Sequence, residues 1–467
     1  MKVLLVSPCP PDNQRDESMA FPQLTLPLLA GMTPKEYDVE IVEEVFNQEI
    51  DFDQEVDIVG ISIMTQTAIR GYEIANEFKK RGKTVIFGGI HATVLPKEAI
   101  MYGDAVVIGE AENGLWEQVL KDIQDGTLKE FYKLANYPNL DKYIMPRRDL
   151  TRDMPGRFAI APIETGRGCP YNCDFCTVPK SFGSKQRHKM IDSIIKDIEG
   201  IKEKNLFFLD DNITINKKFA RELFEKLIPL KKGWVGQASI NIVNDKELMS
   251  LARKSGCKGL LIGFESMTDT GLNKYRKTFA SFDRNVEAIK TLQDNGIMVM
   301  ASLVFGLDDD TTEVFDTAWE FLSKAKPAFL QACALTPYPG TEVFDRMKED
   351  GRILTDDWRQ FDAKKVIVTP KKMTAEELQN GYTTIKDKTY SFKSIMSRSL
   401  PNIFAGLTHT ALYFTLNFGA RKWHKGGLTA EPYRNSPDMP VDFDVTKYVK
   451  PFLAEKKVKD EFFFLSN

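Results

Sequence analysis

The chain has 467 residues, of which 42% are hydrophobic, and a formal net charge of −3 at pH 7. This length is enough for two or three domains with sizeable cores. The nearly balanced charge argues against nucleic acid or an anionic membrane as the main partner.

Cysteine usage and the first residues of the chain indicate a reducing cytoplasm. The apolar run Val3–Val6 is too short for the core of a signal peptide, and a Pro-rich turn follows it at once, so we expect a buried strand. The chain has six cysteines, and Cys9, Cys257 and Cys333 are scattered among apolar strands or loops. We expect these three to be buried free thiols of a cytoplasmic protein.

Short apolar segments alternate with helix-like segments in the first third of the chain. Helices are expected at Ala68–Arg81, Pro96–Met101 and Glu110–Ile123. This alternation predicts an α/β fold with a doubly wound, Rossmann-like parallel sheet. The expected strands are Lys2–Val6, Val39–Glu43, Ile58–Ile63, Thr84–Gly88 and Ala105–Ile108.

Polar residues and glycines follow three of these strands. Sheets of this kind bind their ligands at the carboxyl ends of the strands. Each group also has a simpler explanation, because Gly88 and Gly89 could form a tight turn and Ser62 could cap a helix. The candidate ligand-binding residues are Ser62, Thr65, Gln66, Gly88, Gly89, His91, Gly109 and Glu110.

The patterns Gly-Gly-x-His and Gly-Glu-x-Glu after successive strands resemble a cobalamin-binding domain. The resemblance implies that the eight candidates contact cobalamin, with glycines that let the backbone approach a large flat cofactor. The segment Pro8–Met19 contains no histidine, so the lower axial position of cobalt would not be filled from there. His91 is expected to contact the cofactor tail and not cobalt. A flavodoxin-like domain that binds nothing is the alternative.

A second strand–helix series follows a linker rich in Pro and Asn at 136–154. Six strand–helix units in a row predict a partial (β/α)6 barrel, with active groups on the loops at the carboxyl ends of the strands. The expected strands are Arg157–Glu164, Asn205–Leu209, Gly233–Ile240, Gly259–Gly263, Ile297–Val304 and Ala328–Ala334.

Three cysteines follow the first of these strands with the spacing C-x3-C-x2-C: Cys169, Cys173 and Cys176. Thiolates on one such loop can hold three irons of a [4Fe-4S] cluster. A structural zinc is the alternative, but it needs four ligands, and the nearest histidine, His188, is twelve residues past Cys176. A disulfide is not expected in a chain without a secretory signal.

The cysteine loop and the strand ends after it resemble the radical S-adenosylmethionine superfamily over 155–351. In that family the fourth iron is open and binds S-adenosylmethionine. The resemblance implies hydrogen bonds from its amino group to acidic or amide side chains, ribose binding by a carboxylate, and close packing of adenine on a glycine and an aromatic ring. The implied residues are Asp210, Asp211 and Asn212 for the amino group, Glu265 for ribose, Gly306 and Phe175 for adenine, and Gln237, Ser239, Ser266, Pro337 and Tyr338.

Each of these residues could singly be part of a turn or a cap. Pro337 and Tyr338 belong to the segment Thr336–Thr341, which resembles the family's TPYPGT turn. Arg187 and His188 only loosely resemble the family's R-x-R region, and a solvated charge is the simpler interpretation.

The strand pattern stops near Pro370, and helices are expected after it. Thr374 and Glu377 form a capping box that opens the first helix, and helices should continue through Arg398. The nearly uncharged segment Ile403–Phe418 is shorter than the ~20 apolar residues of a membrane span. A buried helix is the favoured interpretation, and an interfacial helix or a wall for a greasy substrate is the alternative.

We therefore expect a cobalamin-binding-like domain at 1–135, a linker at 136–154, a radical S-adenosylmethionine barrel at 155–369 and a mainly helical domain at 370–467. This domain order is similar to that of hopanoid and bacteriochlorophyll methylases. It implies a methyltransferase in which S-adenosylmethionine supplies a radical and cobalamin passes on a methyl group to an unactivated carbon. A radical cyclase or coupling enzyme with an accessory cobalamin domain is the first alternative. An iron–sulfur or cobalamin protein without catalysis is the second.

The expected partners follow from the same resemblance. The substrate would be a small molecule, and the aromatic C-terminal segment favours a hydrophobic polycyclic or isoprenoid compound. A flavodoxin or ferredoxin type of protein would supply single electrons. Contact with a membrane surface is compatible with the sequence, whereas a membrane span and nucleic acid are not expected.

Overall fold

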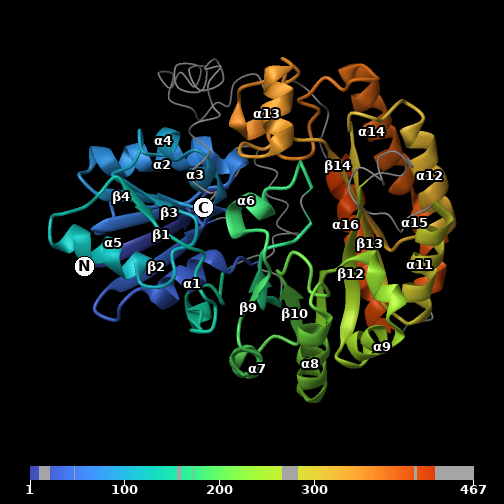
Figure 1. Ribbon diagram of the computed structural model, residues 1–467, viewed down its shortest axis with the longest axis horizontal. Coiled ribbons are helices and arrows are strands. Elements are labelled where there is room, and N and C mark those ends of the chain that lie inside the picture. The colour runs from blue at the N-terminus through green and yellow to red at the C-terminus, as the bar shows by residue number, and fades with distance from the viewer. Residues whose placement is uncertain are drawn as a thin grey trace.

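Figure 1 shows the computed structural model, which describes residues 1–9, 22–46, 48–154, 159–171, 173–265, 282–403 and 407–425. Two α/β units lie side by side, each built on one sheet (Figure 1). Five features of the sequence fall wholly or partly outside the described residues. These are Ser266, most of Pro8–Met19, the first residues of the strand expected at Arg157–Glu164, residues 404–406 of the segment Ile403–Phe418, and the tail from residue 426 onward.

The first unit contains a sheet of six parallel strands in the order β2-β1-β3-β4-β5-β6. The central strands are apolar runs buried on both faces, as expected for parallel strands between helices. This confirms the predicted doubly wound sheet. The strands are β1 (Lys2–Ser7), β2 (Asp38–Glu43), β3 (Ile58–Ser62), β4 (Thr84–Gly88), β5 (Ala105–Ile108) and β6 (Phe131–Lys133).

Helices cover both faces of this sheet (Figure 1). One core forms between the sheet and α2 (Ala68–Lys80), α3 (Ile90–Val94) and α4 (Pro96–Ala99). The other core forms under α1 (Thr25–Met32) and α5 (Leu115–Gln124), around the buried indole of Trp116.

The start of α5 differs from the prediction, which placed it at Glu110. Asn113 and Gly114 have φ angles of 55° and 84°, and two left-handed residues in succession stop a right-handed helix from extending backward. Residues 110–112 therefore form an irregular segment ahead of the helix. Helix α1 and strand β6 were not predicted. In β6 only Tyr132 is buried, which is too short a pattern to read from a sequence.

The second unit contains six parallel strands in the order β14-β13-β12-β11-β10-β7. This confirms the predicted partial barrel. The strands are β7 (Ile160–Ile163), β10 (Asn205–Phe208), β11 (Gly233–Gln237), β12 (Cys257–Glu265), β13 (Met298–Phe305) and β14 (Phe329–Ala334). Strand β11 ends before the predicted Ile240 because Ser239 caps the short helix η5 (Ile240–Asn244), accepting a hydrogen bond from the Asn241 amide.

Helices pack on the outer face of this sheet and form one large core with it. The inner face is only half-buried: in β13, for example, buried residues alternate with partly exposed ones such as Ser302. The packed helices are α7 (Ile191–Gly200), α8 (Lys217–Leu227), α9 (Lys246–Lys254), α11 (Phe282–Asp294), α12 (Val314–Ala325) and α14 (Ala375–Thr389).

A small antiparallel hairpin stands between the two sheets. Its strands are β8 (Gly166–Arg167) and β9 (Arg187–His188), and the segment between them carries the cysteine motif and α6 (Val178–Phe182). Figure 1 places α6 and β9 in the centre of the molecule, between the two sheets. The hairpin was not predicted, since two-residue strands have no readable periodicity.

Later parts of the chain also pack on the first unit. Phe344 of α13 (Glu342–Glu349) and Trp358 of the short helix η6 (Trp358–Gln360) belong to the same core as Leu4 and Phe87. The Trp358 indole donates a hydrogen bond to Glu98 Oε1 at 3.0 Å. The two units therefore form one packed body.

The C-terminal helices cover the outer edge of the second sheet, near β14 (Figure 1). Helix α14 begins with the predicted capping box of Thr374 and Glu377, and α15 (Phe392–Ile403) and α16 (Leu407–Lys425) follow it. Helix α16 buries one face, which includes Tyr413 and Asn417, whereas Phe418 is 38% exposed. In the described parts of the chain, no helix combines the length and the apolar character needed to cross a membrane.

Candidate functional site

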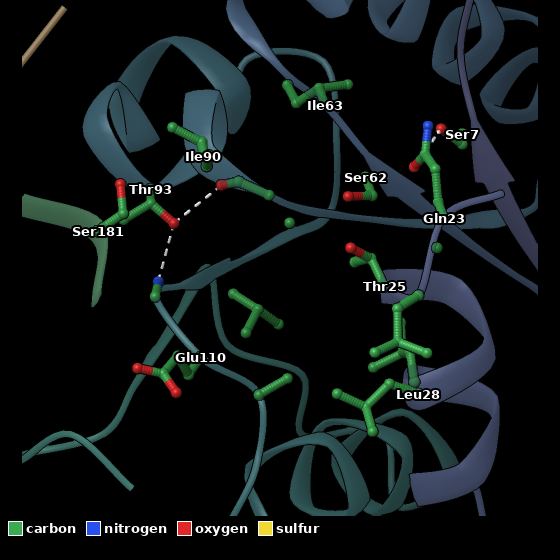
Figure 2. Close-up of a pocket in the computed structure, with 18 of the residues that line it drawn as sticks. Ser7, Gln23, Thr25, Leu28, Ser62, Ile63, Ile90, Thr93, Glu110 and Ser181 are labelled. Carbon is green, nitrogen blue, oxygen red and sulfur yellow. Dashed lines mark hydrogen bonds between the residues drawn. The ribbon is translucent and has the colours of Figure 1, made fainter. Parts of the chain in front are cut away.

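A first cavity of about 280 Å³ opens at the carboxyl ends of β1, β3, β4 and β5. Ser62, Gly88, Gly89, Gly109 and Glu110, all predicted, line it. Figure 2 shows Ser62, Thr25 and Leu28 on one side of the cavity and Thr93, Ser181 and Glu110 on the other.

The glycines around the first cavity are required for different reasons. Gly89 has a φ of 92°, and a Cβ there would lie 2.6 Å from the carbonyl oxygen of Ile63, so only glycine fits. A Cβ on Gly88 or Gly109 would meet nothing within 4 Å. These two positions therefore present bare backbone to open space, as a large flat ligand would require.

Thr93 joins two of the glycine loops. Its hydroxyl donates to the Gly89 carbonyl and accepts from the Gly109 amide, each at 2.9 Å (Figure 2). This residue was not predicted from the sequence, although its spacing of four from Gly89 on a helix could have indicated it. Leu24, Thr25 and Leu28 were not predicted either, because they come from the unpredicted region of α1.

His91 does not line the first cavity. The side chain is 0% exposed and points into the core, where Nε2 lies 3.1 Å from Glu98 Oε1 and the ring packs against Trp358. The reason is helical phase: Ile90 and Thr93 share the face of α3 that lines the cavity, and His91 falls on the opposite face. Thr65 and Gln66, in the short helix η2 (Thr65–Thr67), are also not among the lining residues.

The second unit completes the first cavity. Ser181 and Phe182 of α6 and Leu209 after β10 line it together with the first sheet. Ser181 is 4% exposed, and its hydroxyl has no hydrogen-bond partner among the described residues. A buried hydroxyl of this kind needs a partner, so the cavity suits a ligand that offers polar groups on this side.

A second cavity of about 370 Å³ lies at the carboxyl ends of β10 to β14. The motif cysteines and most of the residues predicted to surround S-adenosylmethionine line it. The predicted residues in its wall are Cys169, Cys173, Cys176, Phe175, Asp211, Asn212, Gln237, Ser239 and Glu265.

The three cysteines are half-buried in the loop within the β8–β9 hairpin. Backbone hydrogen bonds shape this loop, from the Cys176 amide to the Cys173 carbonyl and from the Cys169 amide to the Gly183 carbonyl. Burial, reinforced by neighbouring negative charge, raises the pKa of Cys176 to about 12. A thiolate there would need a strong cation beside it, as iron provides.

No three His, Cys, Asp or Glu side chains of the described residues are gathered to share one metal ion. The cysteines of an iron–sulfur cubane each ligate a different iron and do not need to converge on one point. A structural zinc needs four ligands around one ion. Three cysteines on one loop therefore supply ligands for three irons of a cluster and one ligand too few for a structural zinc.

Asp210, Asp211 and Asn212 follow β10 but have different surroundings. Asp210 is buried outside the second cavity and accepts hydrogen bonds from the Thr165 amide and hydroxyl at 3.0 and 2.5 Å. It therefore joins two strand ends and does not line the second cavity. Asp211 lines the cavity, and burial raises the pKa of its carboxyl to about 6. Asn212 Oδ1 accepts from the Ser239 amide at 3.2 Å and so holds the next strand end in place.

The remaining predicted residues divide in the same way. Glu265 lines the second cavity and has a φ of 60° at the end of β12, which is unusual for a glutamate. Gly306 does not line it; a Cβ there would lie 2.7 Å from Leu378, so its glycine accommodates α14. Pro337 and Tyr338 are also absent from the lining, and Tyr338 packs toward the core of the first unit.

Asn285 of α11 is a lining residue that was not predicted from the sequence. It is 2% exposed, and its Nδ2 has no hydrogen-bond partner among the described residues. Asn285 lies inside an ordinary amphipathic helix, and nothing in the sequence around it indicates a binding residue.

The two cavities converge on one wall. Helix α6 contributes Val178 to the second cavity and Ser181 and Phe182 to the first. After β10, Leu209 faces the first cavity and Asp211 faces the second. The carboxyl-end loops of both sheets thus meet at the interface between the two units.

Comparison with known proteins places this architecture in a defined class. Residues 24–117 match the B12 binding domain family, and residues 163–322 match the Radical SAM superfamily. The fold and the cysteine loop therefore define a radical S-adenosylmethionine enzyme with a B12 binding domain. Its cofactors are a [4Fe-4S] cluster, S-adenosylmethionine and cobalamin.

Two curated relatives come from Chlorobaculum tepidum. Bacteriochlorophyllide d C-8(2)-methyltransferase is 32% identical over 84% of this chain and 90% of the relative. Bacteriochlorophyllide d C-12(1)-methyltransferase is 30% identical over 85% and 89%. The chain belongs to this family of cobalamin-dependent radical S-adenosylmethionine methyltransferases.

A solved structure shares the fold at low sequence identity. The methyltransferase TsrM from Kitasatospora setae, solved with cobalamin and a [4Fe-4S] cluster bound, superposes with a TM-score of 0.66 and 14% identity. The match covers 91% of this chain and 99% of that one.

Proposed function

We propose that this enzyme transfers a methyl group to an unactivated carbon of a hydrophobic small molecule or lipid. The observation that carries the proposal is the common wall between the cysteine-lined cavity and the glycine-lined cavity. A radical source and a methyl donor must approach one substrate carbon within a few ångströms, on the order of 3–4 Å. Cavities on opposite faces of the molecule could not meet this requirement.

We assign the second cavity to the cluster and to S-adenosylmethionine. Cys169, Cys173 and Cys176 would hold three irons, and Asp211 would accept hydrogen bonds from the amino group of S-adenosylmethionine. Glu265 would bind the ribose hydroxyls, and Phe175 would pack on adenine. When bound, these groups supply one-electron cleavage of the sulfonium. Asp210 and Gly306 are assigned supporting roles, in agreement with their contacts to Thr165 and Leu378.

We assign the first cavity to cobalamin. Gly88 and Gly109 would let the ring approach the backbone, and the buried Ser181 hydroxyl would bond to a polar side group of the cofactor. No histidine of the described chain lines this cavity. We therefore expect no protein nitrogen on cobalt, and the chain's task is to orient the cofactor and exclude water.

The substrates of the curated relatives indicate a substrate class for this enzyme. The relatives named above act on bacteriochlorophyllides, and hopanoid C-2 methylase from Rhodopseudomonas palustris is 26% identical over 74% of this chain and 68% of the relative. We infer a polycyclic, largely apolar substrate, either a tetrapyrrole or an isoprenoid lipid.

The proposal is tested by anaerobic product analysis of the reconstituted enzyme with a reductant, S-adenosylmethionine and each candidate substrate. We expect a methylated product together with 5′-deoxyadenosine and S-adenosylhomocysteine. The Cys176→Ala variant should form none of the three, and Cys333→Ala, a cysteine outside the motif, is the matched control.

The cyclase alternative retains one supporting observation. Anaerobic magnesium-protoporphyrin IX monomethyl ester cyclase from Cereibacter sphaeroides is 24% identical over 66% of this chain and 55% of the relative. Release of 5′-deoxyadenosine without S-adenosylhomocysteine, with a product that lacks an added methyl group, would favour that alternative.

A further inference from the structure

Six charged side chains meet where the two units join, and their formal charges cancel. Their side chains are between 2% and 18% exposed, so the group is largely removed from solvent. The first unit contributes two acids, and the other four residues flank the cysteine loop. The members are Glu110, Glu112, Glu164, Arg167, Arg187 and Lys189.

Arg167 is the centre of this charge cluster. Its Nη1 lies 2.5 Å from Glu110 Oε2 and 2.6 Å from Glu112 Oε1. Its Nε and Nη2 lie 2.8 and 3.0 Å from the two oxygens of Glu164. One guanidinium therefore joins the acids of the Gly-Glu-x-Glu segment to the end of β7.

Arg187 makes the second link to Glu110. Its Nη2 lies 2.5 Å from Glu110 Oε1, and its Nη1 donates to the Pro138 carbonyl at 2.8 Å. Nη2 also donates to the Phe182 carbonyl at 3.0 Å, at the end of α6. Arg187 is thus not the solvated charge that the sequence suggested.

The two arginines that bind Glu110 lie at opposite ends of the cysteine loop. Arg167 lies on β8 and Arg187 on β9, so they stand at the two ends of the segment 168–186, which carries the cysteines and α6. A single carboxylate from the first unit therefore holds both ends of the cysteine loop. Both of its oxygens accept bonds from guanidinium groups, so Glu110 is used for charge pairing although it borders the first cavity.

We propose that Glu110 is a positioning residue that locks the cysteine loop to the B12 binding domain and couples the two cofactor sites. The proposal rests on the proposed function. Occupation of the first cavity steadies the segment from Gly109 to Glu112, and Glu110 transmits this order to both ends of the loop. Because partly buried pairs lose far more than exposed pairs when one partner is removed, the lock depends on the Glu110 charge.

The test compares wild-type enzyme with Glu110→Gln by hydrogen exchange of the backbone amides in 168–186, with and without cobalamin. We expect cobalamin to slow exchange in wild type by about tenfold and to have little effect in the variant. The matched control is Glu73→Gln, since Glu73 pairs with Arg70 inside the first unit. This control should respond to cobalamin as wild type does.

Product ratios supply a second readout. In Glu110→Gln we expect methyl transfer to fall on the order of 100-fold through misplacement, while 5′-deoxyadenosine release falls much less. Arg187→Lys keeps the positive charge but loses the paired bonds to Glu110. Its rate of methyl transfer should therefore lie between those of wild type and Glu110→Gln. Arg187→Lys also replaces Glu110→Gln as the test variant if that protein does not fold.

The positioning role would be overturned if cobalamin protected the loop equally in wild type and in both Glu110→Gln and Arg187→Lys. The product ratio of these two variants would then also equal that of wild type. Failure of the proposed function would look different, because wild-type enzyme itself would then produce no methylated compound. The exchange measurement does not depend on substrate, so it tests the lock in either case.

Discussion

Gly88 and Gly89 are adjacent, but their α-carbons face different surroundings. Gly89 needs both a positive φ and the absence of a side chain, because a Cβ would collide with the backbone of Ile63. We expect Gly89→Ala to lower the free energy of unfolding by about 3 kcal/mol or more. Chemical denaturation of the cofactor-free protein measures this loss.

Gly88→Ala is the matched comparison. A Cβ at Gly88 enters open space, so the free energy of unfolding should change by less than about 0.5 kcal/mol. The same methyl group would occupy part of the first cavity and should weaken cobalamin binding. Equal destabilisation by the two substitutions would contradict the different roles assigned to the two glycines.

His91 shows how a correct motif can hold a residue with a different role. His91→Ala removes one of the three hydrogen-bond partners of the buried Glu98 carboxylate, beside Tyr72 and Trp358, and should cost about 1–3 kcal/mol of stability. Electron paramagnetic resonance of bound Co(II) cobalamin should be the same in this variant and in wild type, with no splitting from a protein nitrogen. A nitrogen splitting that disappears in His91→Ala would show that the imidazole reaches cobalt.

At the scale of elements, most of the parallel strands could be predicted because they are short, largely apolar runs. The cysteine loop could be predicted because its chemistry is local. The sequence does not show which face of α3 lies toward the cavity, because Gly89, with its positive φ, breaks the continuity between β4 and this helix. His91 was therefore predicted to face the cavity instead of Thr93. The hairpin β8–β9 and strand β6 are too short to show any period.

The docking of α16 depends on one buried amide. Asn417 is 0% exposed; it donates to the Ala328 carbonyl at 2.8 Å and accepts from Arg398 at 3.1 Å. Asn417→Ala would remove both of these hydrogen bonds and should cost about 1–3 kcal/mol. We expect faster hydrogen exchange in α15 and α16 and no change in the first unit.

Thr415→Ala is the control for this helix, since Thr415 is exposed. Its exchange should match wild type within error. An Asn417→Ala protein with unchanged exchange would mean that apolar contacts alone hold α16.

At the scale of the whole molecule, the charge cluster at the junction of the units should make the stability of the protein depend on pH. Burial alone would raise the pKa of Glu164, but Arg167 and Lys189 hold it at about 2. A carboxylate whose pKa is lowered in the folded state contributes stability above its ordinary pKa, and this contribution is lost as the pH falls toward the folded value. The stabilisation should therefore be complete above about pH 4.5 and should decrease between about pH 4.5 and 2.

The difference in unfolding free energy between wild type and Glu164→Gln isolates this effect. It should be largest at neutral pH, on the order of 3 kcal/mol, and should shrink as the solution is acidified. Denaturant titrations from pH 7 to 3 measure it. A difference that stays constant over this range would show that the Glu164 charge is not what holds the hairpin.

The arrangement of the two units could be predicted only in part. The proposed chemistry requires the strand ends of both sheets to meet, and the common wall of the two cavities agrees. The charge cluster could not be anticipated, because Glu110 and Arg187 are 77 positions apart and neither belongs to a periodic pattern.

The contact between Trp358 and Glu98 also bears on how the protein is made. One core of the first unit is completed by residues up to Val368, which leave the ribosome long after the last strand of that unit. At about 5–20 residues per second, the unit waits roughly 10–50 s with an incomplete apolar face and a carboxylate that still lacks its indole partner. During that interval the nascent chain is a natural client for chaperones, and synthesis that slows between β6 and η6 should lower the yield of folded enzyme.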